Sequence, residues 1–430
     1  MLKDSPYLWC VLSAYVLIQI FKYLLEWLNI RFMRMHGGSV PTGLEGSFDA
    51  ALLDKSQSYM IDRTRLGVAE SVFMSLVLIT FFFGGLLDRY NSWVASLHLP
   101  FLLAGWVFFL ILSFAEQVLS TPFRLLTVFR LERRYGFATT TVRLWLFDLA
   151  KELILSTLIL SILVFPALWL ISQSPAYWWF WFWVVICSFT LLLNYISPYV
   201  IEPLFNKFTP LEDETLRERI ILLALKAGIS ARKVLKMDAS KRTRHSNAYF
   251  TGLGRAKRIV LFDTLLTGMS HGETLAVLAH EIGHWKRHHL LKNMLVLQAF
   301  SLAGLYLLFQ ITKTGLLSTL FRINVDTFFS RITLAAFLAS MVLLLVYPLI
   351  MAFTRRMEKE ADFFSLELMT DTGAGAPDLI SALAKLSKDN LSNLHPHPLY
   401  VMFHYSHPPV LERIRVLREA ENKGYGSRVT

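Results

Sequence analysis

Seven stretches of predominantly apolar residues, most of them about 20 residues long, constrain this chain more than any other feature of its sequence. A helix of about that length crosses a hydrocarbon core of about 30 Å. Hydrophobic residues make up 54% of the 430 residues and charged residues only 17%, whereas about a quarter of the residues of a soluble domain are charged. One apolar run could be a buried helix of a soluble core, but seven predict a mainly α-helical, multi-pass membrane protein. The predicted spans are residues 7–25, 67–87, 99–115, 153–171, 176–196, 290–311 and 332–353.

The loops between these spans differ in their content of basic residues. Arg89 is the only Lys or Arg between the second and third spans, whereas six such residues, Arg133 and Arg134 among them, separate the third from the fourth. Because basic loops favour the cytoplasm, we predict an outside or lumenal N-terminus and a cytoplasmic C-terminus. The net charge of +11 is interpreted as part of this topology signal. Nucleic acid is not predicted as a partner, because no module of basic and aromatic residues accompanies the charge.

The sequence His-Glu-Ile-Gly-His at residues 280–284 is an H-E-x-x-H motif, which lies on the predicted cytoplasmic side just before the sixth span. On a helix, residues four apart share one face, so both imidazoles can reach one metal ion. Glu281 is then placed to take a proton from a water molecule that the metal activates. The alternative is a surface helix with two unrelated histidines. Cys10 and Cys187 both fall inside predicted spans, so any metal must be held by His and carboxylate side chains.

Two histidines do not complete a catalytic zinc site, which takes three protein ligands. The best candidate for the third is Glu358, because Asp362 lies four residues later and could hydrogen-bond a ligand imidazole from the same helical face. Glu360 is expected to point away towards solvent, and His288 and His289 are expected on a solvated or membrane-edge face. The alternative is that residues 355–362 form only a charged helix beside the membrane.

The polar region at residues 198–286 is predicted to be a folded insertion. Its second strand directly precedes the motif helix, and an edge strand in this place can hold an extended substrate by backbone pairing. The strands could equally serve only to cover the helix, and both interpretations stay open. The predicted elements are a helix at 211–229, strands at 248–250 and 258–262 joined by a turn at 252–254, and the motif helix at 264–289.

Four motifs together resemble the type I CAAX prenyl protease family of integral-membrane zinc metalloproteases. They are His-Ser-Asn-Ala-Tyr-Phe-Thr-Gly at 245–252, the motif at 280–284, Arg-Arg-x-Glu-x-x-Ala-Asp at 355–362, and Ser-His-Pro-Pro-Val-Leu-Glu-Arg at 406–413. The resemblance covers most of the chain, because residues 137–141, Asp148 and Lys151 are also similar to the family's loop between spans three and four.

This resemblance implies a seven-helix bundle that encloses a chamber, with a small α+β gluzincin-type zinc metalloprotease domain on the cytoplasmic side. The expected domains are residues 1–197, 198–289, 290–353 and 354–430. The implied site has one Zn²⁺ held by His280, His284 and Glu358, Glu281 as general base, His407 as transition-state stabiliser, Asp362 and Arg413 as supporting residues, and Asn247, Ala248 and Tyr249 on the substrate-binding edge.

The expected function is cleavage of prenylated, C-terminal CAAX-type proteins or of other membrane-associated proteins, with the lipid bilayer as the second partner. A short sixth loop at 312–329 and the absence of a lysine-based retrieval signal at 426–430 favour a bacterial inner membrane, with the endoplasmic reticulum expected if the source is eukaryotic. The alternatives are a bacterial quality-control protease without prenyl substrates and a transporter-like membrane protein with an inactive protease domain.

Overall fold

The computed structural model describes residues 6–42, 44, 46–229, 233–251, 258–370 and 372–423. Within these residues seven helical segments are long and apolar enough to cross a membrane, which confirms the seven predicted spans and the mainly helical fold. The predicted turn at 252–254 and the C-terminal residues 426–430 lie outside the described residues. The seven segments are α1 (Pro6–His36), α2 (Ala50–Phe83), α4 (Phe101–Leu126) with its continuation to Tyr135, α6 (Val142–Gln173), α7 (Trp178–Ile196), α12 (His289–Lys313) and α14 (Phe328–Met369).

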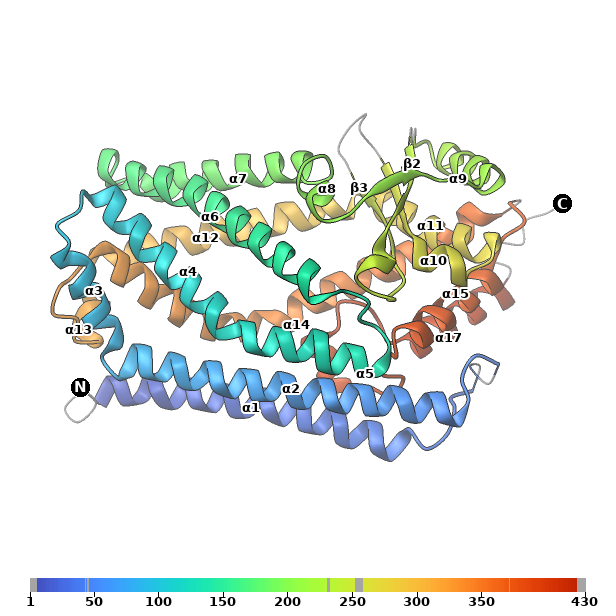
Figure 1. Ribbon diagram of the computed structural model, residues 1–430, viewed down its shortest axis with the longest axis horizontal. Helices are drawn as coiled ribbons and strands as arrows, with labels where there is room; N and C mark the ends of the chain where they lie inside the picture. Colours follow the sequence, from blue (N-terminus) through green and yellow to red (C-terminus); the bar gives the residue numbers. More distant parts are fainter. Residues whose placement is uncertain are drawn as a thin grey trace.

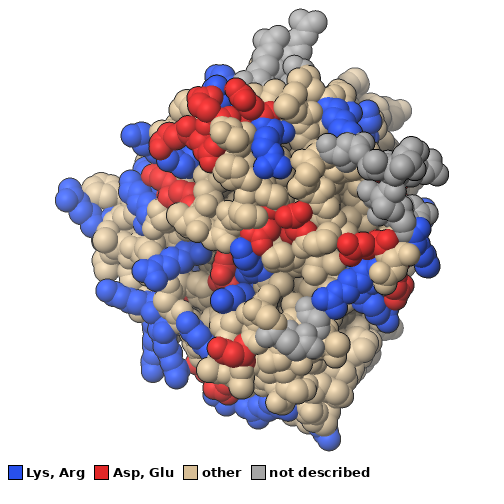
Figure 2. Space-filling model, turned by 90° about the vertical axis from the view of Figure 1, so that its right-hand side faces the viewer, with Lys and Arg blue, Asp and Glu red and all other residues tan. Residues whose placement is uncertain are grey.

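Successive spans run in alternating directions along the long axis of the molecule (Figure 1). The polar insertion and the C-terminal helices lie together at one end, and two short helices, α3 (Leu86–Ser96) and α13 (Leu316–Leu320), lie at the other. We call these the catalytic end and the distal end. Lys and Arg side chains are spread over the catalytic end (Figure 2).

The spans are held together most tightly at the distal end. A cluster of buried apolar side chains, rich in phenylalanine, joins α2, α4 and α14, and the rings of Phe82 and Phe337 stack there at a centroid separation of 4.2 Å. Beside it, the buried carboxylate of Asp88 accepts hydrogen bonds from the backbone and the side-chain amide of Asn324, at 2.8 and 2.6 Å. Towards the catalytic end the spans leave room for a cavity of about 1080 Å³, bounded in part by α1 and α2.

The insertion contains a four-stranded sheet in the order β1-β2-β4-β3, in which β3 is an edge strand. The strand that directly precedes the motif helix is β4, which is paired on both sides, so the prediction of an edge strand in that place is wrong. Strand β3 (Ala248–Thr251) pairs antiparallel with β4 (Arg258–Phe262), as the sequence predicts, with Ala248 opposite Leu261. The sequence did not reveal β1 (Phe208–Pro210) and β2 (Lys233–Met237), which complete the sheet.

The predicted motif helix at 264–289 is wrong in its extent, because the structure divides this segment. Helix α10 (Asp263–Gly268) ends before Ser270, whose hydroxyl caps the start of α11 (His271–Lys286) in a capping box with Glu273. Such a cap satisfies the free N–H groups that begin a new helix. After α11 the chain turns at His288, which has a left-handed backbone, and α12 begins at His289.

Helix α11 is the centre of the catalytic end. Ten of its residues are buried. It packs against β3 and α14, and also against α9 (Glu214–Lys226) and α15 (Ala376–Asp389). The remaining elements are the end of the third span, η1 (Thr127–Glu132) and α5 (Arg133–Tyr135), then α8 (Ile201–Phe205), η2 (Ala239–Lys241), α16 (Pro398–His404) and α17 (Val410–Asn422).

The alternation of the spans can be tested by labelling single cysteines with a membrane-impermeant thiol reagent, after Cys10 and Cys187 are replaced by serine. We expect cysteines at Lys55, Arg133 and Asn422 to react from one side of the membrane and a cysteine at Gln173 to react from the other, because all four residues are exposed and Gln173 ends α6 at the distal end. Reaction of positions 133 and 173 from the same side would contradict the seven-span arrangement.

Candidate catalytic metal centre

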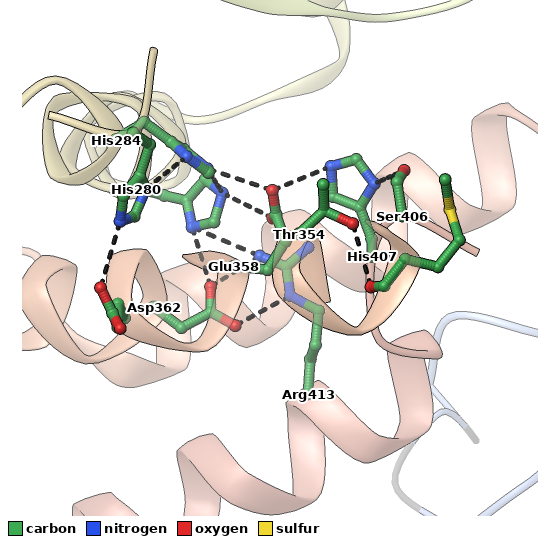
Figure 3. Close-up of polar contacts among 11 residues, drawn as sticks. His280, His284, Thr354, Glu358, Asp362, Ser406, His407 and Arg413 are labelled. Carbon is green, nitrogen blue, oxygen red and sulfur yellow. Dashed lines mark hydrogen bonds and ion pairs between the residues drawn. The ribbon is translucent and has the colours of Figure 1, made fainter. Parts of the chain in front are cut away.

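Three side chains from two helices meet at one point in the catalytic end (Figure 3). The Nε2 atoms of His280 and His284, one turn apart on α11, are separated by 3.1 Å. The Glu358 carboxylate reaches them from α14. Its Oε2 atom lies 3.3 Å from Nε2 of His280, and its Oε1 atom lies 3.3 Å from Nε2 of His284. One donor atom from each residue lies within 4.8 Å of the other two. The sequence therefore identified the three residues that the structure brings together.

Glu358 does not belong to a solvated helix beside the membrane. Helix α14 continues from the seventh span, and its face at Met357, Glu358, Ala361 and Asp362 is buried against α11. Gly283 allows this close contact, because a Cβ atom added there would lie 3.0 Å from both Cα and the carbonyl oxygen of Ala361. Gly283, the only glycine of the five-residue motif, therefore sets the separation of the two helices that supply the cluster.

Asp362 orients the first imidazole, as the sequence predicts. Its Oδ1 atom lies 2.8 Å from Nδ1 of His280, so the Nδ1 proton is donated there and Nε2 points towards Glu358, at 3.3 Å. Arg413 on α17 binds the same carboxylate through two nitrogens, at 2.6 and 2.9 Å. Burial lowers the pKa of His280, but the hydrogen bonds to Asp362 and Glu358 outweigh this effect and raise it to about 9.

His289 and Glu360 do not have the solvated positions that the sequence suggested. His289 is only 2% exposed, and its Nδ1 atom lies 2.9 Å from Nδ1 of His284. Its Nε2 atom lies 3.3 Å from the half-buried Glu360 carboxylate. The turn at His288 rotates the start of α12 away from the face that an unbroken helix would give, and this places His289 beside the second imidazole.

Glu281 lies next to the cluster on the wall of a cavity of about 210 Å³, which His284 also lines. Burial raises the pKa of the Glu281 carboxyl. The other walls of this cavity are Asn194, Phe250, Thr251, Trp285 and Leu290, of which only Phe250 and Thr251 lie in a motif singled out in the sequence. They come from α7, the edge strand β3 and the junction of α11 with α12.

His407 approaches the cluster from the opposite side, where Nε2 lies 3.3 Å from a Glu358 oxygen and Nδ1 lies 2.8 Å from the Ser406 hydroxyl. Its side chain is 60% exposed and faces the larger cavity of about 1080 Å³. An imidazole in this position is free to donate a hydrogen bond to a group bound at the cluster.

The predicted substrate-binding residues lie on or just before the edge strand. Asn247 is exposed, and its side-chain oxygen accepts a hydrogen bond from the Ala248 backbone N–H at 2.8 Å. Ala248 is buried. The Tyr249 hydroxyl donates to Glu202 at 2.8 Å, on the face of the sheet away from the cluster. Tyr249 therefore presents its backbone rather than its side chain to the open edge.

Comparisons with known proteins agree with this arrangement. A family described as CAAX prenyl protease N-terminal, five membrane helices, matches residues 29–207, and peptidase family M48 matches residues 210–421. A CAAX prenyl protease 1 homolog of Oryza sativa subsp. japonica is 31% identical over 97% of this chain and 99% of its own. CAAX prenyl protease 1 of Saccharomyces cerevisiae is 31% identical over 91% of each chain. An uncharacterized metalloprotease of Bacillus subtilis, YhfN, is 30% identical over 83% of this chain and 82% of its own.

The fold is also shared with a solved structure. The crystal structure of S. mikatae Ste24p aligns with a TM-score of 0.88 and 28% identity, and covers 96% of this chain and 99% of that one. The helical bundle, the cluster of two histidines and a glutamate that could hold a metal ion, and these similarities together define an integral-membrane metalloprotease. The chain belongs to the CAAX prenyl protease family of M48 peptidases. The predicted fold, family and enzyme class are confirmed, and an inactive transporter-like protein is not favoured.

The close contact at Gly283 gives a stability prediction. We expect Gly283→Ala to destabilise the protein by about 1–3 kcal/mol, because the new methyl group must push α14 away from α11. Gly304→Ala in α12 is the matched control, since a Cβ atom there meets nothing within 4 Å. Thermal unfolding of the two variants in detergent is the measurement. Equal stability of both variants would contradict the tight contact.

The contact between His289 and His284 gives a second prediction. We expect His289→Ala to weaken metal binding by about 10- to 100-fold, because residues that orient a metal ligand affect affinity by that much. The control is His288→Asn, since His288 is exposed and asparagine tolerates its left-handed backbone. Competition with a metal-chelating indicator dye measures the affinity. Unchanged affinity in His289→Ala would show that His284 needs no such support.

Proposed function

We propose that this protein is a zinc-dependent endopeptidase in which His280, His284 and Glu358 hold one Zn²⁺ ion. Two imidazole nitrogens and a carboxylate are a donor set that suits catalytic zinc, which leaves a further coordination position open. Among the residues that the structure describes, the buried Oε2 atom of Glu358 makes no well-aligned hydrogen bond, and Nε2 of His280 faces it at 3.3 Å. A bound cation would satisfy this oxygen, which is otherwise costly to bury.

When bound, zinc would polarise the scissile carbonyl and activate the attacking water molecule. Glu281 accepts the proton of that water and later delivers it to the leaving amine. Two observations support this role: Glu281 lies on a cavity wall beside His284, and burial raises the pKa of its carboxyl. A raised pKa brings the base closer to the pH at which the enzyme must both accept and return a proton.

His407 donates a hydrogen bond to the oxyanion that develops as water attacks, because its exposed imidazole faces the substrate side of the cluster. Asp362 keeps His280 in the tautomer that leaves Nε2 free. Arg413 holds Asp362 through two hydrogen bonds and so fixes the first imidazole indirectly.

The proposed substrates are membrane-associated proteins with a prenylated, CAAX-type C-terminus. The names of the plant and yeast relatives, which are CAAX prenyl proteases, support this substrate class. The open edge of β3 supports binding of an extended peptide at Asn247, Ala248 and Tyr249 by backbone pairing. The cluster lies between α11 of the polar insertion and α14, which continues from the seventh span, and this position suits a substrate that is anchored in the bilayer.

We also propose that the catalytic end faces the cytoplasm and that the N-terminus is outside or lumenal. The basic side chains of this end support the orientation. The membrane is the bacterial inner membrane, which the short connection between α12 and α14 favours, or the endoplasmic reticulum in a eukaryotic cell.

Two substitutions separate the roles of base and ligand. We expect Glu281→Gln to retain metal but to lower kcat by about 10²- to 10⁴-fold, because an amide cannot accept the proton. We expect Glu358→Ala to lose both metal and activity. Elemental analysis of the purified protein and cleavage of a farnesylated CAAX peptide, with and without a chelator, measure the two properties.

The control for both variants is Glu367→Gln, an exposed position on the same helix as Glu358, which should keep metal and activity. Full zinc occupancy in Glu358→Ala would rule out the third ligand. Equal cleavage of farnesylated and unmodified peptides would favour a membrane-protein protease without prenyl specificity.

A further inference from the structure

The chain segment that ends in the edge strand β3 connects the two cavities beside the metal cluster. His245, at the start of this segment, lines the larger cavity. Phe250 and Thr251, within β3, line the smaller cavity together with Glu281. Strand β3 also packs against α11, the helix that supplies the two imidazoles of the cluster. A shift of His245 would therefore move the start of the substrate-binding edge relative to the cluster.

The end of the third span holds His245. The Nε2 atom of the imidazole lies 3.3 Å from Oε2 of Glu132, the last residue of η1. The other Glu132 oxygen accepts a hydrogen bond from the Tyr59 hydroxyl of α2 at 2.7 Å. Segment η1 is a π-helical turn, and such turns within α-helices are frequent at functional sites. Glu132 thus joins two membrane helices to the segment before β3.

Three further contacts hold His245. Its Nδ1 atom lies 2.7 Å from the side-chain oxygen of Asn390, at the end of α15. Its ring stacks on Phe137 at a centroid separation of 4.1 Å. Its carbonyl accepts a hydrogen bond from the Thr264 hydroxyl at 2.9 Å. Both ring nitrogens face an oxygen acceptor, and this arrangement suits an imidazolium, which donates from both nitrogens.

The residue after Asn390 indicates that these segments are fitted closely together. Leu391 has a left-handed backbone, with a φ of 47°, which is rare for a bulky residue and persists where the surrounding structure imposes it. Its buried side chain lies in one apolar cluster with Leu131 of the third span and with Phe137. The end of α15 is therefore fixed against the same elements that hold His245.

The loop after the third span is also tied to the segment before β3. The Arg244 N–H donates to the Phe137 carbonyl at 3.0 Å, and the Thr139 N–H donates to the Arg242 carbonyl at 3.3 Å. The Arg242 guanidinium in turn binds Asp148 of α6 through two nitrogens, at 2.9 and 3.1 Å. Backbone and side-chain contacts thus join this segment to both the third and the fourth span.

We propose that the Glu132–His245 pair fixes the edge strand β3 for backbone pairing with the substrate, so that the third membrane span sets where an extended peptide binds. The inference deepens the proposed function and rests on it, since it requires substrate binding at β3. His245 and Glu132 are positioning residues, because they act through the strand and not on the reacting atoms.

The charge of His245 sets the strength of this pair. Burial lowers the pKa of His245, but the hydrogen bonds to Glu132 and Asn390 outweigh this effect and raise it above its ordinary value. The Arg63 guanidinium of α2 opposes the rise. Below the pKa, the imidazolium donates a charge-assisted hydrogen bond to the carboxylate. As the pH rises through the pKa, the positive charge and its part of the attraction are lost.

The first test uses a farnesylated CAAX peptide and copies of it, each with one N-methylated backbone amide near the scissile bond. An N-methyl group removes the hydrogen bond that this amide would give to the strand. For the full-length protein in liposomes, we expect at least one copy to lose about tenfold in kcat/KM. In His245→Ala the unmodified peptide should fall by a similar factor, mainly in KM. That copy should lose little more, because both changes remove the same pairing.

The second test is the pH profile of KM for the unmodified peptide. We expect the KM of the wild-type protein to rise as the pH passes above the pKa of His245. In Glu132→Gln this rise should shift to lower pH, because a neutral amide no longer stabilises the imidazolium. The glutamine oxygen can still accept the hydrogen bond from Tyr59. A residue that served only to stabilise the fold would not move this profile.

The matched control is Arg244→Gln. Arg244 is exposed and adjacent to His245, and its contact with Phe137 is made by the backbone, so the variant should keep the wild-type KM and pH profile. Metal content should be unchanged in all three variants. Glu132→Gln preserves the size of the side chain, so it tests the proposal even if His245→Ala does not fold.

The contrary results differ in meaning. Wild-type cleavage of every N-methylated copy as fast as the parent peptide would overturn pairing at β3, and this inference with it, but not the metalloprotease activity. A loss in kcat alone in His245→Ala, or an unmoved profile in Glu132→Gln, would overturn the positioning role. Hydrolysis of an unrelated membrane protein but of no CAAX peptide would overturn the proposed substrate class, and the pH profile of that hydrolysis in Glu132→Gln would then decide the positioning role.

Discussion

The contact between α11 and α14 is the constraint on which the rest of the catalytic end depends. The cluster takes two donors from one helix and one from the other, so its geometry is the geometry of that crossing. Gly283 permits the contact. Buried hydrogen bonds between charged groups, in the pairs His280–Asp362 and Asp362–Arg413, stabilise it. Buried charges of this kind are tolerated because each has its partner. A shift of either helix would misplace a donor and leave a buried charge unpaired.

The membrane helices contribute more than an anchor. Their close packing is concentrated at the distal end, and towards the catalytic end the spans surround a cavity that carries ionisable groups such as Lys22, Glu26 and Glu70. Such groups are costly against lipid and are retained where they face a bundle interior or water. The bilayer thus forces the spans to be apolar outside, while the bundle keeps a polar interior that leads to the metal cluster.

The sequence predicted the features that depend on strong local patterns. Seven long apolar runs fixed the spans, and two spaced His and carboxylate motifs identified His280, His284, Glu358 and Asp362. Strand β1 was missed because it has only three residues. Strand β2 is as long as β4, but its pairing depends on partners that are distant in the sequence. The break before α11 was not predicted, but it could have been, since Ser270 and Glu273 form the S-x-x-E pattern of a capping box.

The position of His289 could not be predicted from helical periodicity alone. Its contact with His284 depends on a left-handed turn at His288, and a rare backbone conformation of a non-glycine residue is set by tertiary structure. The cavity walls at Asn194 and Leu290 were beyond prediction for a similar reason, because they meet the edge strand only after the spans have packed. The functional assignments of Asn247, Tyr249 and His407 remain predictions.

The division of the cluster between α11 and α14 has a consequence for biosynthesis. His280 and His284 precede the sixth span, whereas Glu358 follows the hydrophobic part of the seventh. A nascent chain therefore carries both imidazoles, and the base between them, well before the third donor has been translated. The complete donor set can form only after both spans of the last hairpin have been translated. The order of residues along the chain thus postpones a complete site until nearly all of the membrane part has been made.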